Sequence, residues 1–239
     1  LFIKTIISCN KYDFCISVGG INSRMNINGP KTLVKHNGTI ILEDIIKKIH
    51  PFANNIYICS NVKYKTYFNL FEQKIEYNNV KFLYLNSLDG SQDYPKGNGE
   101  TIYQLLKKEN ITNKLFVLWG DIIISNHLLF EEMYNLSYDC NLLIPTIYEK
   151  DPYAYLNIDN RNNVTGIGYK KHNPIDYGYH DQCIFLFDTK TLLEKLEKIT
   201  LNQYEELNLL DVVDYFHNIK YYQTKYRVHS FNTTEELHI

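Results

Sequence analysis

The stretch that decides the fold is FCISVGGINSRMNINGPK, residues 14–31. It opens with an apolar run over residues 14–18 and breaks at Gly19 and Gly20, as a buried strand does where it ends in a loop. Because glycine has no Cβ, backbone N–H groups in such a loop can come close to an anion. The stretch therefore predicts a first strand followed by a loop suited to phosphate.

Two cations follow in the same stretch. Arg24 offers a planar guanidinium for phosphate oxygens, and Lys31 offers a mobile point charge. Together they would hold a triphosphate. The same residues also fit a plain turn between a strand and a helix with two surface cations. A second sequence signal is therefore needed to support a phosphate site.

The chain around this stretch alternates between strand and helix patterns. Apolar runs predict strands over residues 56–60, 80–85 and 115–119, and helical spacing predicts helices over 41–49, 63–71 and 100–109. Farther along we expect strands over 141–147, 154–158, 164–169 and 183–187, helices over 192–196 and 207–216, and a last strand over 227–231 that returns to the sheet. The sequence thus predicts an α/β fold with a mixed, mainly parallel sheet flanked by helices.

The second signal is Asp121, which follows Gly120 directly after the apolar run over residues 115–119. In open α/β sheets, ligands lie outside the carboxyl ends of the strands, where the glycine loop and Asp121 would meet. A carboxylate there is a candidate Mg²⁺ ligand, because that ion takes hard oxygen donors and bridges substrate phosphates. Capping of a following helix is the alternative for an isolated aspartate.

Composition excludes several classes of protein. Hydrophobic residues make up 44% and charged residues 22% of the chain, which excludes a disordered protein. A formal charge of -2 leaves no overall basic field for nucleic acid or an anionic membrane, and no apolar stretch is long enough for a membrane span. Five scattered cysteines without a C-x-x-C pair fit a reducing, cytoplasmic location. We expect residues 1–239 to form one domain; a start at Leu1 rather than Met is typical of a trimmed chain or of a domain excised from a longer protein.

Taken in order, these motifs resemble those of the sugar-1-phosphate nucleotidyltransferases, the pyrophosphorylases that make nucleotide sugars, and most nearly their N-acetylglucosamine-1-phosphate uridylyltransferase domains. The family's opening signature, a G-x-G/S-x-R-M loop and then P-K, is similar to a set of residues here: Gly19, Gly20, Ser23, Arg24, Met25, Pro30 and Lys31. Its base-reading segment, a Gln five residues before a G-T-x turn, resembles Gln92 and the turn at residues 97–99. Its G-D metal motif resembles residues 120–121, and its two C-terminal motifs resemble residues 206–211 and 232–237.

This resemblance covers nearly the whole chain and implies a Rossmann-like nucleotidyltransferase fold of the GT-A-like kind. It implies that the nucleotide is bound by Gly19, Gly20, Ser23, Gln92, Gly97 and Asn98. It also implies that Arg24 and Lys31 act on the phosphates, and that Asp121 and Asn232 hold Mg²⁺.

The sugar segment departs from the family pattern. The family's Glu-Lys pair, which contacts sugar hydroxyls and the sugar phosphate, aligns with Tyr169 and Lys170. Asp181 stands where the family often has an Asn that reads the sugar, and Cys183 stands where a Gly is usual. The resemblance therefore implies that Tyr169, Lys170 and Asp181 bind the sugar phosphate with a different hydroxyl preference.

The resemblance implies a Mg²⁺-dependent enzyme that transfers a nucleotidyl group from a nucleoside triphosphate, UTP first, to a sugar 1-phosphate, releasing pyrophosphate. Positioning and charge neutralisation carry this kind of chemistry, so no nucleophilic side chain is needed. Two alternatives stay open: a cytidylyltransferase that acts on a non-sugar phosphate, and a non-catalytic module that binds nucleotide sugars. The residues also leave open the identity of the sugar and the oligomeric state.

Overall fold

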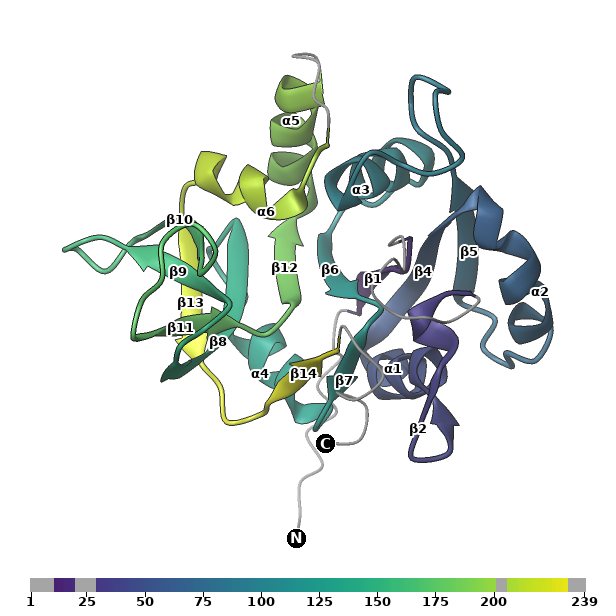
Figure 1. The fold of residues 1–239 in the computed structure, drawn as a ribbon, viewed down its shortest axis with the longest axis horizontal. Coiled ribbons are helices and arrows are strands. Elements are labelled where there is room, and N and C mark those ends of the chain that lie inside the picture. The colour runs from purple at the N-terminus through teal and green to yellow at the C-terminus, as the bar shows by residue number, and fades with distance from the viewer. Residues whose placement is uncertain (1–10, 20–28, 201–205, 232–239) are drawn as a thin grey trace, which may run out of the picture.

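Eight strands of the described residues form one sheet through the molecule (Figure 1). The computed structural model describes residues 11–19, 29–200 and 206–231. The strand order is β11-β8-β12-β6-β1-β4-β5, and β13 pairs with β8. The strands are β1 (Tyr12–Ser17), β4 (Ala53–Asn61), β5 (Val80–Leu85), β6 (Lys114–Trp119), β8 (Leu142–Lys150), β11 (Tyr177–Asp181), β12 (Ile184–Asp188) and β13 (Ile219–Gln223).

The strands from the N-terminal half of the chain pair in parallel. β1 pairs in parallel with β4 on one side and with β6 on the other, and β5 extends the sheet beyond β4. In the second half, β12 pairs antiparallel with β6 and β8, β11 pairs antiparallel with β8, and β13 pairs with β8 in parallel. This mixed, mainly parallel sheet confirms the predicted fold class.

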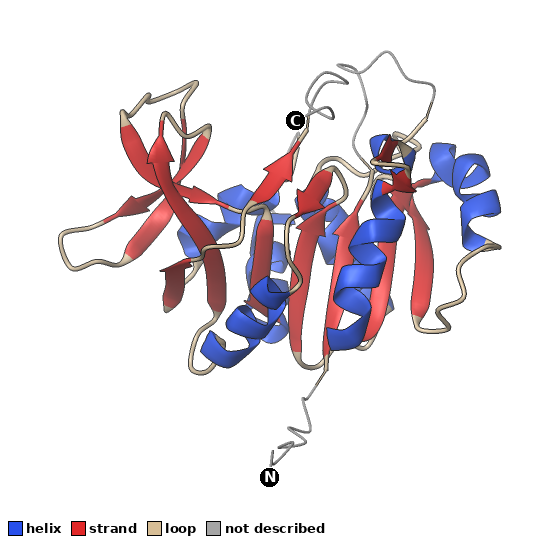
Figure 2. Cartoon of the chain, turned by 90° about the horizontal axis from the view of Figure 1, so that it is seen from below, coloured by secondary structure: helices blue, strands red, loops and turns tan. Residues whose placement is uncertain are grey.

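Helices cover both faces of this sheet (Figure 2). They are α1 (Ile41–Ile49), α2 (Lys65–Glu72), α3 (Asn98–Lys108), α4 (Leu128–Leu136), α5 (Thr189–Thr200) and α6 (Leu209–Val212). α1, α2 and α4 pack with Phe14 and Phe116 in one hydrophobic core, and α3, α5 and α6 pack with Cys15 and Val117 in another, on the opposite face of the sheet (Figure 1). Successive strand residues point to opposite faces, which explains why the buried stretches of β1 and β6, residues 14–16 and 115–118, are apolar on both faces.

The helix α1 shows how the sequence pattern produces one of these elements. Its residues Ile41, Leu42, Ile45, Ile46 and Ile49 are all buried against the sheet. Its polar face carries two ion pairs with i,i+4 spacing, Glu43–Lys47 at 2.7 Å and Asp44–Lys48 at 2.6 Å. The predicted bounds of 41–49 are confirmed.

In the part of the chain that the structure describes, three pairs of short strands lie outside the main sheet. They are β2 with β3 (Lys35–His36 and Thr39–Ile40), β7 with β14 (Ile122–Ile124 and Val228–Ser230), and β9 with β10 (Ala154–Ile158 and Val164–Tyr169). The prediction that residues 227–231 return to the main sheet is wrong, because β14 pairs antiparallel with β7. β6 already has β1 and β12 on its two sides, so β14 meets no open edge there and pairs with the strand that follows Asp121.

Other boundaries differ from the predicted ones for local reasons. The helix expected over 207–216 is shortened to α6 and a 3-10 turn, Val213–Tyr215. Leu207 cannot be helical, since its N–H donates to the Lys96 carbonyl at 2.8 Å and its own carbonyl accepts from Gly99 at 2.8 Å. The helix expected over 63–71 begins as a 3-10 turn, Val62–Tyr64, before α2. The remaining 3-10 turns of the described residues are Lys31–Leu33 and His50–Phe52.

None of the helices in the described ranges is both long enough and apolar enough to cross a membrane.

Three aromatic rings hold α4 to the centre of the sheet. The rings of Phe14 and Phe116 stack with centroids 4.5 Å apart, and Phe130 of α4 meets both edge-on at 5.6 and 5.7 Å. We predict that Phe130→Ala lowers the free energy of unfolding by about 3–5 kcal/mol, because it leaves a cavity in this cluster. Urea unfolding monitored by circular dichroism measures the change. The control is Leu70→Ala on α2, whose side chain is 68% exposed and whose loss should cost less than about 0.5 kcal/mol; equal costs would contradict this packing.

Candidate functional site

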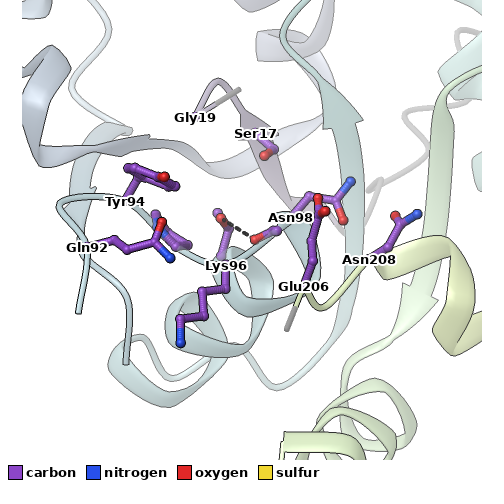
Figure 3. Close-up of a pocket in the computed structure, with 11 residues that line it drawn as sticks. Ser17, Gly19, Gln92, Tyr94, Lys96, Asn98, Glu206 and Asn208 are labelled. Atoms are coloured by element: carbon purple, nitrogen blue, oxygen red, sulfur yellow. Dashed lines mark hydrogen bonds between the residues drawn. The ribbon is translucent and has the colours of Figure 1, made fainter. Parts of the chain in front are cut away.

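A pocket of about 560 Å³ opens where β1 ends (Figure 3). It is lined by Ser17, Gly19, Gln92, Tyr94, Pro95, Lys96, Gly97, Asn98, Thr101, Glu206 and Asn208. Gln92 and Tyr94 lie on one side of the hollow, and Asn98, Glu206 and Asn208 lie on the other (Figure 3). The fold therefore brings together four residues predicted to bind nucleotide: Gly19, Gln92, Gly97 and Asn98.

Residues 96–99 form one wall of the pocket through backbone contact with Leu207. Gly99 donates its N–H to the Leu207 carbonyl at 2.8 Å, and Leu207 donates to the Lys96 carbonyl at 2.8 Å. Gly97 has φ of +96°, and a Cβ on this residue would collide with the Leu207 carbonyl. Glycine is required at position 97 both for its left-handed backbone and for this close approach.

The Asn98 side chain has a structural partner as well as a place in the pocket wall. Its Oδ1 accepts the N–H of Leu209 at 2.6 Å, at the start of α6. A helix N-terminus has N–H groups without partners in the helix, so this bond satisfies one of them. The side-chain oxygen of Asn98 thus already accepts a hydrogen bond that joins two segments of the pocket wall.

Gln92 sits in a loop whose backbone is fixed from within. Ser87 donates its N–H to the Gln92 carbonyl at 3.1 Å, and the Gln92 N–H donates to Ser87 Oγ at 2.9 Å. Among the residues that the structure describes, no hydrogen bond is made by the Gln92 side-chain amide, which lines the pocket. The amide can therefore offer both a donor and an acceptor to a ligand.

Lys31 and Asp121, predicted for different roles, form an ion pair. Lys31 Nζ lies 3.5 Å from Asp121 Oδ2, and the lysine side chain is largely buried. Asp121 follows Gly120, whose N–H donates at 2.9 Å to the carbonyl of Ser17 in the pocket wall. Burial raises the pKa of Asp121, and the positive charge of Lys31 opposes that shift. The pair therefore lies beside the pocket at the carboxyl ends of β6 and β1, as the strand pattern predicts.

The described residues contain no group of three or more His, Cys, Asp or Glu side chains that could hold a metal ion. Asp121 provides one carboxylate, and Phe231, just before the predicted ligand Asn232, donates its N–H to the Asp121 carbonyl at 3.1 Å. This donor set fits Mg²⁺, which commonly takes one or two protein oxygens and fills its other positions with water and phosphate. The partly buried Asp121 carboxylate would also gain a compensating charge.

Four of the predicted site residues lie outside the described residues: Gly20, Ser23, Arg24 and Asn232. Their assigned roles stay predictions.

The predicted sugar residues differ in their surroundings. Tyr169, at the end of β10, has a buried hydroxyl close to the Asn208 side chain of the pocket wall, and burial raises its pKa to about 12. Lys170 is exposed and its Nζ pairs with Asp151 Oδ2 at 2.5 Å. Asp181 is 3% exposed, and burial raises its pKa while nearby His180 opposes the shift. Tyr169 is therefore next to the pocket, whereas Lys170 has a partner at the surface.

Cys183 keeps the backbone conformation that a glycine would favour. Its φ is +55°, in the left-handed region, and its N–H donates to Asp181 Oδ1 at 2.9 Å. The turn between β11 and β12 thus has the shape expected for the family's glycine, with Asp181 supporting it.

No model of a known protein family matches the chain. The bifunctional protein GlmU of Methanocaldococcus jannaschii is 27% identical over 190 residues, which cover 78% of this chain and 41% of that protein. A probable UDP-N-acetylglucosamine pyrophosphorylase of Acanthamoeba polyphaga mimivirus is 26% identical over 235 residues, covering 90% of this chain and 85% of the relative. Among solved structures, HddC of Yersinia pseudotuberculosis in complex with GMP-PN superposes with a TM-score of 0.74 at 20% identity, covering 95% of this chain and 96% of that one.

The chain is similar to proteins named as sugar-nucleotide pyrophosphorylases, as the motifs predict. It spans less than half the length of the archaeal relative. The likeness to HddC concerns the fold, and the sheet of this chain has the arrangement that the motifs predict.

Sequence reasoning missed several residues that line the pocket. Tyr94 and Lys96 lie between Gln92 and Gly97, so the loop that joins two predicted residues could have indicated them. Glu206 and Asn208 lie in the segment that resembles the family's E-x-x-L-T-D motif, which was a usable signal. Ser17 carried no signal, because as a strand residue it fits a structural position equally well.

We predict that Gly97→Ala destabilises the protein by about 3 kcal/mol or more and weakens nucleotide binding, because it adds a collision with Leu207 to the cost of a left-handed alanine. Gly90→Ala is the matched control: Gly90 has φ of +70°, and a Cβ there would meet nothing within 4 Å. That control should cost only about 1 kcal/mol. Urea unfolding and calorimetric nucleotide titration measure both variants, and similar values for the two would contradict the role of close approach.

Proposed function

We propose that the chain is an enzyme that transfers a nucleotidyl group from a nucleoside triphosphate, with UTP favoured, to a sugar 1-phosphate. The observation that carries this proposal is the position of the Lys31–Asp121 pair beside the pocket that contains Gly19, Gln92 and Asn98. In this proposal, the Lys31–Asp121 pair forms the phosphate end beside the pocket, and Gln92 forms the base end within it.

At the phosphate end, the proposed reaction needs positioning and positive charge. An oxygen of the sugar phosphate attacks the α-phosphorus in line, a new P–O bond forms, and the bond to the β-phosphate breaks with release of pyrophosphate. Lys31 would neutralise charge that develops on the α-phosphate. Gly19, which has no side chain, would let the phosphates approach the end of β1, and Arg24 would bind the outer phosphates.

A bound Mg²⁺ would neutralise phosphate charge and would be held by Asp121, with Asn232 as a second oxygen donor. Asp121 would also keep Lys31 oriented through the 3.5 Å contact between Nζ and Oδ2. The partial burial of the pair strengthens this interaction relative to one in water.

At the base end, Gln92 supports the choice of a pyrimidine. Its amide can donate one hydrogen bond and accept another, which matches the paired donor and acceptor on the edge of uracil. Tyr94 adds an aromatic wall on the same side of the pocket. Cytidine and thymidine nucleotides remain testable alternatives.

At the sugar end, Tyr169 and Asp181 would contact the acceptor. Tyr169 lies next to Asn208 of the pocket wall, and Asp181 is close enough to affect the Tyr169 pKa. A phenol in place of the family's carboxylate can donate as well as accept, which would change the preferred sugar hydroxyls. Lys170 would reach a sugar phosphate only by giving up its pair with Asp151.

We predict that Lys31→Ala keeps the fold and lowers kcat by about 100-fold or more, corresponding to roughly 3 kcal/mol of lost transition-state stabilisation. Lys35→Ala, which removes an exposed lysine of β2, is the matched control and should change the rate less than about twofold. Steady-state pyrophosphate release with circular dichroism as a folding check measures both. A wild-type rate in Lys31→Ala would refute the assigned role.

We predict that pyrophosphate release requires a pyrimidine nucleoside triphosphate, a sugar 1-phosphate and Mg²⁺, and that chelation by EDTA stops it. A panel of UTP, dTTP, CTP and GTP against N-acetylglucosamine 1-phosphate and glucose 1-phosphate identifies base and sugar together. Turnover of CTP with a non-sugar phosphate, or nucleotide-sugar binding without turnover, would instead favour one of the two alternatives named from the sequence. Tightest binding of a purine nucleotide would refute the base assignment.

A further inference from the structure

Glu100 is a buried acidic residue for which the proposed chemistry has no role. It lies in the first turn of α3, between Gly99 and the pocket residue Thr101, and its exposed fraction is 0%. Burial of a carboxylate is costly unless hydrogen bonds compensate it. The contacts of Glu100 therefore need a structural reason.

Both carboxylate oxygens of Glu100 accept backbone N–H groups from one loop. Oε1 accepts from Leu88 at the start of the loop, and Oε2 accepts from Lys96 at its end, at 2.7 Å. Gln104, one turn farther along α3, donates Nε2 to Glu100 Oε1 at 3.4 Å and to the Asn86 carbonyl at 2.7 Å. One carboxylate thus holds the two ends of the loop over residues 86–97 together, with Gln104 as a brace.

This loop carries the base-binding side of the pocket. Gln92 and Tyr94 lie within it, and Ser87, next to the clamped Leu88, bonds the Gln92 backbone through its Oγ and its N–H. The bond from Glu100 to Leu88 and the bonds from Ser87 to Gln92 are joined by the peptide bond between Ser87 and Leu88, so Glu100 is linked to the backbone of Gln92. A change in the spacing of the loop ends would move the Gln92 amide relative to the pocket.

We propose that Glu100 is a positioning residue for base selection, which acts by clamping the loop over residues 86–97 and so setting the direction of the Gln92 amide. This inference rests on the proposed function, because it takes the pocket as the nucleotide site. An amide cannot replace the carboxylate here: its oxygen would accept one of the two N–H groups, but its NH₂ would face the other, donor against donor.

The variant that tests the clamp is Glu100→Gln, which keeps the size of the side chain and removes one acceptor. We expect the Leu88 and Lys96 amides to exchange with deuterium at least about tenfold faster than in the wild type. We also expect UTP affinity to fall about tenfold and the preference for UTP over CTP and GTP to shrink by a similar factor, while kcat at saturating substrate stays within about threefold. Hydrogen exchange, calorimetric titration with each nucleotide and steady-state kinetics measure these effects.

Glu197→Gln is the matched control, because it makes the same carboxylate-to-amide change outside the loop. Glu197 lies on α5, and its exposed side chain pairs with the exposed Lys107 side chain at 2.8 Å. Exposed pairs contribute little, so exchange and base preference should stay within about twofold of wild type. If Glu100→Gln fails to fold, Ser87→Ala decides the question, since it removes the two hydrogen bonds between Ser87 Oγ and the Gln92 backbone and leaves the buried Glu100 carboxylate in place.

The clamp is overturned if the variant keeps the full preference for UTP, or if every nucleotide weakens alike together with thermal stability. It is overturned as well if the wild type binds all of the nucleotides equally well. Where Ser87→Ala replaces Glu100→Gln, an unchanged preference for UTP in Ser87→Ala also overturns it. A wild type that binds nucleotides with a preference but turns over no substrate pair would refute the proposed function. In that case titration and exchange of the variants still decide the role of Glu100.

Discussion

The pocket depends on one backbone contact between two segments that are far apart in the sequence. Leu207 exchanges hydrogen bonds with Lys96 and Gly99, and α6 begins on the side chain of Asn98. Because Gly97 and Gly99 have no Cβ, the two segments approach each other closely enough for these bonds. Without this contact, Glu206 and Asn208 would not face Gln92 and Tyr94, and the wall that closes the site would be missing.

The parallel half of the fold was predictable because its sequence pattern is local. The central runs of β1 and β6, residues 14–16 and 115–118, are apolar and buried, as parallel strands with a core on both faces must be, and α1 shows a clear helical period. β11 and β13 were missed because their residues, YGYHD and IKYYQ, alternate between contact with the core and solvent and contain no continuous apolar run. The place of β14 could not be predicted, since it depends on which strand edges its neighbours leave open.

The site was predictable where it depends on strand ends and not where it depends on contacts between loops. The ends of β1 and β6 had to meet at one edge of the sheet, which placed Gly120 against Ser17, and Lys31 of the 3-10 turn Lys31–Leu33 pairs with Asp121 there. The clamp by Glu100 has no such local signal, because an acidic residue in the first turn of a helix is common on electrostatic grounds alone. Its two partners, Leu88 and Lys96, are identified by the structure of the loop.

The two ends of the pocket are built differently, and this explains where the sequence departs from the family pattern. At the proposed base end, position is set by backbone hydrogen bonds and by glycines that tolerate no side chain, so a substitution there would disturb the pocket itself. At the proposed sugar end, the turn at Cys183 has a left-handed backbone although the glycine is absent, and Tyr169 fits beside Asn208. Side chains at that end can therefore change while the fold and the opposite wall of the pocket stay intact, so in the proposed function the acceptor is the part of the reaction most open to change.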